Sequence, residues 1–252
     1  MLLTDAPAIF TTTSPGRMPA ALADAAKATR AIADKESGRW LAATRVCAAV
    51  AEVAAKVVSV ADREADIYQH FAARPAGVEM IVRARHDRPT RNGASLFKTP
   101  ETFRLLGVAS VHVPPRGPGD AGRMAEVSIK AGMVEIVRPK ARSATQNAPA
   151  TITLGLVEIA EVSAPSHTKP LVWRLLTTLP AGTFAEATEV ARLYRLCWRI
   201  EQLFRTLKSD DLDVEASQVT EARRLFKLAA LGLIDAARIM QLVDARDGSA
   251  RP

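Results

Sequence analysis

The sequence predicts a mixed α/β protein, and three observations support this class. Short runs rich in valine and isoleucine alternate with alanine-rich and leucine-rich stretches towards both ends of the 252-residue chain. Between them, over residues 87–178, prolines and glycines separate short apolar segments that are typical of β-strands. An acidic residue directly follows one of the apolar runs near the start. We therefore expect a β-rich insertion between two α/β pieces.

The first α/β piece precedes residue 87. The elements expected in it, in order, are a strand at Ala8–Thr12, an alanine-rich stretch at Ala20–Lys35 that is helical or loosely ordered, a helix at Glu36–Lys56, a strand at Val57–Ala61, a helix ending at about Phe71, and a strand at Val78–Arg85. The run Val57–Ala61 is short and β-branched, which favours a strand buried on both faces. The piece thus reads as helices alternating with strands.

The β-rich stretch follows, with its longest loop expected at Pro139–Pro149. Its expected strands are Ala109–Val113, Met124–Ile129, Met133–Val137, Ile152–Ala160 and Leu171–Thr178. Trp173 lies on the last of them, and a tryptophan on an apolar strand is usually a core residue.

A long helix is expected from Ala185 to Lys208, because this stretch contains neither proline nor glycine. At about 100° per residue, one stripe of apolar side chains should face a core. The stripe comprises Leu193, Leu196, Ile200, Leu203 and Leu207. A second strip, within roughly 40° of arc, comprises Tyr194, Cys197, Glu201, Arg205 and Lys208. A final helix is expected at Thr220–Asp244.

The second strip suits a site that handles phosphodiesters. The carboxylate of Glu201 can hold a divalent cation, while Arg205 and Lys208 can bind phosphate oxygens. The strip alone favours an ordinary Glu–Arg pair on a surface helix, worth only tenths of a kcal/mol, over this site.

Asp62 stands directly after the predicted strand Val57–Ala61, in the segment D-R-E-A-D-I-Y. An acid at the carboxyl end of a buried strand is where α/β proteins present metal ligands and catalytic carboxylates. Asp is also a favoured helix N-cap, and the two roles are compatible. The residue alone leaves both interpretations open.

The composition favours a basic protein with an acidic partner. There are 34 Lys and Arg against 27 Asp and Glu, a formal charge of +7 and a pI near 9.8, which favour nucleic acid or reflect a generally basic proteome. Cys47 and Cys197 are too few for a disulfide framework, which fits a reducing cytoplasm. We find no signal peptide, no membrane span, no glycine-rich phosphate loop and no zinc-type Cys/His spacing. A cytoplasmic protein without a membrane partner is expected.

Two separated motifs resemble the DDE transposases of bacterial insertion sequences, in the Tn-five-like group of the insertion-sequence-four family. They are D-R-E-A-D-I-Y at Asp62–Tyr68 and Y-x-x-x-W-R-I-E-x-x-F-R-x-x-K at Tyr194–Lys208. The likeness extends to K-E-S-G-R-W-L-A-A at Lys35–Ala43, I-V-R-A-R-H at Ile81–His86 and P-L-V-W-R-L-L-T-T at Pro170–Thr178. It covers about residues 35–247.

The resemblance implies an RNase H-like catalytic core with a β-rich subdomain inserted between the second and third catalytic acids. Asp62 matches the second acid and Glu201 the third. In the family, these acids and a first Asp hold two Mg²⁺ or Mn²⁺ ions, which activate water and then a 3′-hydroxyl to attack DNA phosphodiesters. The matched DNA-binding positions are Tyr194, Arg205, Lys208, Trp173, Arg83, Arg63 and Trp198. Of these, Trp173 matches the aromatic residue that receives a flipped base.

The chain departs from the family in several places. Cys197 occupies the position of a family arginine, and no residue matches the first acid, whose core strand would precede Ala8–Thr12. The family's amino-terminal DNA-end-binding domain and carboxy-terminal dimerisation helices are also unmatched, which predicts an internal fragment lacking the first core strand. We expect residues 1–86 to form the first part of the core, 87–180 the inserted subdomain, 181–247 the helices that complete the core, and 248–252 a tail.

The resulting prediction is a DDE transposase acting on DNA that is inactive alone, because its two-ion site lacks an acid unless Asp5 supplies it. Expected partners are transposon ends, target DNA and a second copy or a full-length transposase, with nucleoid association when DNA is bound. The alternatives are a non-catalytic DNA-binding remnant that competes for transposon ends, and a product that never folds stably because a missing strand exposes a sheet edge.

Overall fold

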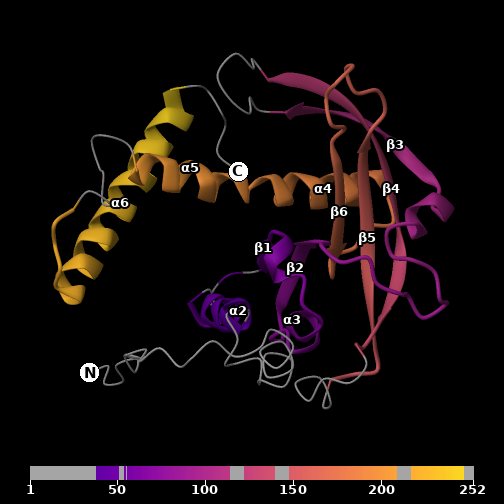
Figure 1. Ribbon diagram of the computed structural model, residues 1–252, viewed down its shortest axis with the longest axis horizontal. Coiled ribbons are helices and arrows are strands. Elements are labelled where there is room, and N and C mark those ends of the chain that lie inside the picture. The colour runs from indigo at the N-terminus through magenta and orange to yellow at the C-terminus, as the bar shows by residue number, and fades with distance from the viewer. Residues whose placement is uncertain are drawn as a thin grey trace, which may run out of the picture.

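The computed structural model describes residues 38–50, 54, 56–113, 122–139, 148–208 and 217–246, without the side chains of Val50, Trp198, Glu201, Asp244 and Arg246. In these residues a curled six-stranded sheet is combined with several helices, which confirms a mixed α/β fold (Figure 1). The strands lie in the order β1-β2-β6-β5-β4-β3. The expected elements at Ala8–Thr12 and Ala20–Lys35, the residue Asp5 and most of the expected loop at Pro139–Pro149 fall outside the described residues.

Strands β1 (Val57–Ala61) and β2 (Val78–Arg83) are parallel neighbours at one end of the sheet. The expected bounds of β1 are confirmed, but its full burial is wrong. It is the edge strand of the sheet and pairs with β2 alone. Most of its residues are half-buried. The strand β2 ends before Ala84, because the backbone N–H groups of Arg85 and His86 turn to the carboxylate of Asp66.

The segment between β1 and β2 is not the continuous helix that the sequence predicts. It forms a 3₁₀ turn, η2 (Arg63–Ala65), then an extended residue, Ile67, and the short helix α3 (Tyr68–Ala72). The helix α2 (Gly38–Val50) packs against β1 and is also shorter than expected, since Lys56 is already non-helical ahead of the strand.

The remaining strands are antiparallel and extend the same sheet. They are β3 (Leu105–Val113), β4 (Arg123–Val137), β5 (Thr151–Glu161) and β6 (Val172–Thr177), with the 3₁₀ turn η3 (Thr99–Thr102) before β3. The two strands expected at Met124–Ile129 and Met133–Val137 are one strand of 15 residues, because β5 pairs with it continuously through Gly132. The β-rich stretch is therefore joined through β6 to β2, and its division at residues 87 and 180 stays a prediction.

Each face of the sheet has its own apolar cluster. One is covered by α4 (Phe184–Arg195) and contains Ile129, Trp173, Leu175 and Val190. The other is covered by α3 and the segment before β3, and contains Met80, Leu96 and Leu156. Alternation along each strand sends successive side chains to opposite clusters. The helix α4 begins in a capping box in which Thr183 and Glu186 bond each other's backbone N–H groups.

The long helix expected at Ala185–Lys208 is two helices, α4 and α5 (Trp198–Leu207). At Leu196 and Cys197 the backbone bonds tighten to the i→i−3 pattern, which turns each residue by about 20° more than an α-helix does. The expected apolar stripe is consequently only partly buried. Leu207 is 8% exposed, whereas Leu196 is 41% and Ile200 is 54% exposed.

The final helix α6 (Ala222–Arg246) packs on α5, and the two cross on the side of the molecule away from the sheet (Figure 1). The expected final helix is thus confirmed within two residues at each end. None of the helices in the described ranges combines the length and the apolar character that crossing a membrane requires.

Candidate nucleic-acid site

Asp62 lies at the carboxyl end of β1, at the N-cap position of η2. Its side chain makes no capping hydrogen bond, so the N-cap interpretation accounts only for its backbone carbonyl, which accepts from Ala65 N–H at 3.0 Å. The carboxylate is 61% exposed and points to the end of α4 instead. This side chain is thus available to a ligand.

Tyr194, in the last turn of α4, donates its hydroxyl hydrogen to Oδ1 of Asp62 at 3.0 Å. This contact joins the two predicted motifs, which are 132 residues apart in the chain. The ring of Tyr194 is 3% exposed and burial, above all, raises the pKa of its phenol. The phenol therefore stays protonated and holds the carboxylate. Because the ring is buried, Tyr194 is better placed to orient Asp62 than to contact DNA.

Trp173 lies in the core and is 6% exposed. Its ring meets the ring of Tyr194 edge to face, with centroids 5.4 Å apart and planes at 67°. The strand β6 therefore directs Trp173 into the apolar cluster beneath α4. In this arrangement the core role that the residue alone suggested is confirmed, and a flipped base has no open ring face to stack on.

Arg83, the last residue of β2, lies between Asp62 and β6. Its guanidinium donates to the carbonyl oxygen of Val172 at 3.3 Å and is 3.9 Å from Oδ1 of Asp62. Its side chain is 21% exposed. One carboxylate oxygen of Asp62 is thus flanked by a phenol and a cation, and Arg83 retains donors for an anion.

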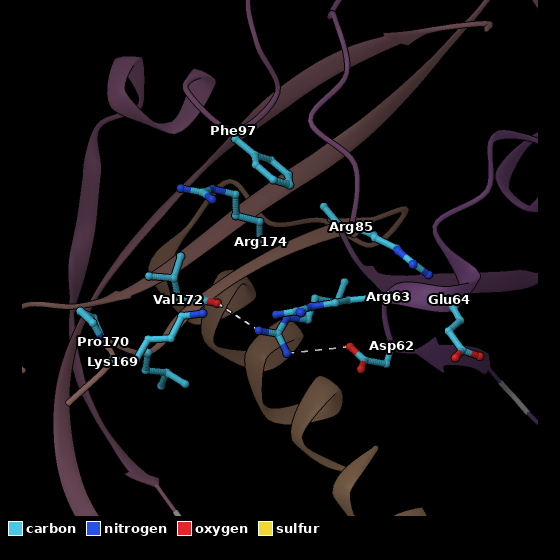
Figure 2. Close-up of a pocket in the computed structure, with 12 residues that line it drawn as sticks. Asp62, Arg63, Glu64, Arg85, Phe97, Lys169, Pro170, Val172 and Arg174 are labelled. Atoms are coloured by element: carbon cyan, nitrogen blue, oxygen red, sulfur yellow. Dashed lines mark hydrogen bonds and ion pairs between the residues drawn. The ribbon is translucent and has the colours of Figure 1, made fainter. Parts of the chain in front are cut away.

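A pocket of roughly 870 Å³ opens at this end of β1, β2 and β6. Asp62 and Glu64 lie on one side of it and Phe97 and Arg174 on another (Figure 2). The cations that line it are Arg63, Arg83, Arg85, Lys169 and Arg174. Asp62 and Glu64 are the acids in this lining, and Glu64 is paired with Arg39 at 2.7 Å. The pocket therefore carries an excess of positive charge.

Among the pocket residues that were not predicted as site residues are one aromatic residue and three cations: Phe97, Arg85, Lys169 and Arg174. In the sequence, Arg85 stood out only as one of the basic residues in the segment Ile81–His86. The other three come from the loop before η3, the loop before β6 and β6 itself. The antiparallel pairing of β2 with β6 brings Lys169 and Arg174 to the end of β2, and the guanidinium of Arg174 lies over the Phe97 ring.

The other predicted residues lie on α5 or at its end. Glu201 and Trp198 are in α5, and their side chains are outside the description. Arg205 and Lys208 are exposed, near the end of the helix that packs on α6. At about 1.5 Å per residue, Glu201 lies roughly 10 Å and Arg205 roughly 16 Å along the helix from Tyr194. The residues expected to share one helix face are thus divided between two helices, with Tyr194 in α4 and Glu201 and Arg205 further along in α5.

Cys197 lies at the junction of α4 and α5, close enough to Asp62 for the charge of the carboxylate to affect its thiol. Burial, with a smaller contribution from Asp62, raises the pKa of the Cys197 thiol to about 11. The thiol is therefore neutral at physiological pH, and it does not replace the positive charge of the arginine that the resembling family has here.

Among the described residues, no group of three or more His, Cys, Asp and Glu side chains is placed to hold a metal ion. Asp62 offers Oδ2 as a hard oxygen ligand, since Tyr194 and Arg83 engage Oδ1. A comparison of the sequence with models of known protein families finds no match.

Proposed function

We propose that the chain is the core of a DDE-type DNA transposase, with an RNase H-like fold, that acts on phosphodiesters through Asp62 and Glu201. The observation that carries the proposal is the hydrogen bond from Tyr194 to Asp62. It joins the end of β1 to the helix pair that bears Glu201, and these are the two segments on which the resemblance rests.

The electrostatics of the pocket support the same proposal. Five cations and two acids line the pocket; Glu64 is paired with Arg39 at 2.7 Å, and Asp62 lies 3.9 Å from Arg83. This excess of cations suits a phosphate backbone bound beside an acid. Arg83 would bind a phosphate oxygen next to Asp62, and Arg63 would extend this contact from η2. Tyr194 keeps the carboxylate oriented by donating to Oδ1.

A divalent ion would be held by Oδ2 of Asp62 and by Glu201, and Mg²⁺ or Mn²⁺ fits these hard oxygen donors. When bound, such an ion stabilises the charge on the attacking and leaving oxygens of the phosphodiester. Two acids hold two ions less well than three, so we propose that the chain is inactive alone and acts with a second copy or a full-length transposase.

Titration with Mn²⁺ alone tests the metal site. Asp62→Asn and Glu201→Gln should each weaken Mn²⁺ binding at least tenfold, whereas Glu64→Gln, a charge-matched change in the same pocket, should leave it unchanged. Equal affinity for wild type and Asp62→Asn would remove the basis of the proposal.

Cleavage of DNA substrates with Mg²⁺ or Mn²⁺ tests the claim of inactivity. We expect no end cleavage or strand transfer by the purified chain. Robust cleavage would show that a first acid is present, and Asp5→Ala should then abolish it if Asp5 supplies that acid.

A non-catalytic DNA-binding remnant is the second candidate. The observation that favours it is that the cations of the pocket need no metal ion to bind phosphate. Binding that falls steeply with salt, without Mn²⁺ affinity at Asp62, would favour this candidate over the first.

A further inference from the structure

We propose that the wall of the pocket formed by Phe97, Arg174 and Lys169 binds single-stranded nucleic acid, with a base stacked at Phe97 and the backbone on the neighbouring cations. This inference rests on the proposed function only in taking nucleic acid as the ligand. It concerns residues that lie across the pocket from Asp62 and that the resemblance does not assign.

Two cations of the pocket, Lys169 in this wall and Arg85 outside it, are available to an anion. Arg85 and Lys169 are exposed, and among the described residues their side chains have no hydrogen-bond or ion-pair partner. Proteins bind a nucleic-acid backbone through unpaired cations of this kind, which neutralise its phosphates. Arg85 and Lys169 would each bind a phosphate of the nucleic-acid backbone.

An aromatic surface lies in the same wall. The guanidinium of Arg174 is 4.8 Å from the centroid of the Phe97 ring, and its Nε donates to Glu158 at 2.8 Å. The guanidinium is therefore held in place as a flat, charged plane over one face of the ring, which leaves its own outer face to a stacked base. Phe97 and Arg174 together form a fixed platform, which Figure 2 shows on the side of the pocket away from Asp62.

The alternation of β6 explains why the platform is here and not at Trp173. Successive side chains of a strand point to opposite faces, so Trp173 enters the cluster under α4 and Arg174 enters the pocket. Base stacking is thereby assigned to Phe97 and Arg174, and not to the buried tryptophan.

An unpaired strand fits this wall better than a duplex. Apolar side chains, including Pro170 and Val172, line the pocket together with the cations. A duplex presents phosphates and keeps its bases stacked inside, so it has no group for an aromatic and apolar surface. An unpaired base has a free face, and stacking on an aromatic ring tolerates any sequence.

Fluorescence anisotropy of the full chain with labelled oligothymidine, and with a duplex of equal length, tests the inference. Wild type should prefer the single strand. Phe97→Leu should weaken single-strand binding roughly tenfold and duplex binding less than twofold. Lys169→Gln should weaken both and lower the salt slope by about 0.7 for the single strand.

Matched controls lie on α6, outside the pocket. Phe226→Leu changes a phenylalanine that is 77% exposed, and Lys227→Gln removes one exposed lysine charge. Both should bind as wild type. No binding by wild type, no preference for the single strand, or equal effects of Phe97→Leu and Phe226→Leu would overturn the inference. If Phe97→Leu does not fold, an unchanged salt slope in Lys169→Gln would overturn it.

These outcomes are separable from those of the proposed function. Loss of Mn²⁺ binding at Asp62 together with intact single-strand binding would leave this site standing as a binding surface. Single-strand binding that ignores Phe97 and Lys169, with Mn²⁺ bound at Asp62, would leave the proposed function and remove this site.

Discussion

The two ends of the segment 62–66 carry the same side chain in opposite surroundings. The carboxylate of Asp62 is 61% exposed in the pocket, whereas that of Asp66 is 0% exposed. Asp66 pairs with Arg88 and accepts from the backbone N–H groups of Arg85 and His86 at 2.7 and 3.1 Å. One acid is free for a ligand, and the other fixes the chain that leaves β2.

The comparison teaches that an exposed carboxylate and a buried structural carboxylate can lie within a single turn. The 3₁₀ turn η2 separates the two acids, and only Asp66 belongs to the buried network with Arg88. The buried side also holds His70, whose Nδ1 lies 3.1 Å from the carbonyl oxygen of Ala65. Changes on the two sides should therefore have very different costs.

The largest effect is expected from Asp66→Ala. Removing one partner of a buried ion pair leaves Arg88 without its charge partner and two backbone N–H groups unsatisfied, which costs about 3–5 kcal/mol. Urea unfolding followed by circular dichroism would measure it. A loss below about 1 kcal/mol would mean that Asp66 is not the structural half of the pair.

Acidification should act on the same buried side through His70. Burial lowers the pKa of this imidazole below its ordinary value, so the unfolded chain binds the proton more readily. Stability should therefore fall as the pH drops below about 6.5, by at most roughly 1.4 kcal/mol per pH unit. In His70→Gln this part of the pH dependence should disappear, and its persistence would assign it to other groups.

Tyr194→Phe should have an intermediate effect. It removes one hydrogen bond to Asp62 and keeps the ring against Trp173, so about 1 kcal/mol of unfolding free energy should be lost. If Tyr194 orients Asp62, Mn²⁺ affinity should fall while duplex DNA binding stays the same. If duplex DNA binding falls while Mn²⁺ affinity stays the same, Tyr194 is a DNA contact instead.

The smallest effect on stability is expected from Asp62→Asn. The amide oxygen can still accept from Tyr194, and the side chain is exposed, so the unfolding free energy should change by no more than about 0.5 kcal/mol. A thermal melt beside that of Asp66→Ala would check this. A similar loss in both variants would break the distinction between the two acids.

Much of the fold could be predicted because local patterns determine it. The β-branched run Val57–Ala61 gave the bounds of β1 correctly, and periodicity gave α6 closely. Patterns could not reveal where long-range bonds override them. The carboxylate of Asp66 accepts from the backbone N–H of Arg85 where β2 ends, and pairing with β5 carries β4 through Gly132. Sequence offered no signal for the tightened turn at Cys197.

For the candidate site, the motifs located Asp62 and Tyr194, which the structure brings together. They could not show which residues of β6 face the pocket. Trp173 and Arg174 are consecutive, so their side chains point to opposite faces, and the motif does not tell which face carries the pocket. Nor could they show that Phe97 and Lys169 line the same pocket, because this depends on how distant segments of the chain pair in the sheet. The role of Glu201 remains a prediction.

Strand β4 links the two sides of the molecule mechanically. Its 15 residues are flanked by β3 and β5, and they supply Val127 and Ile129 to one apolar cluster and Val134 and Ile136 to the other. Breaking the ladders of β4 would therefore disrupt both clusters. The amide hydrogens of β4 should hence exchange with deuterium only when the entire sheet unfolds, at the slowest rate in the chain.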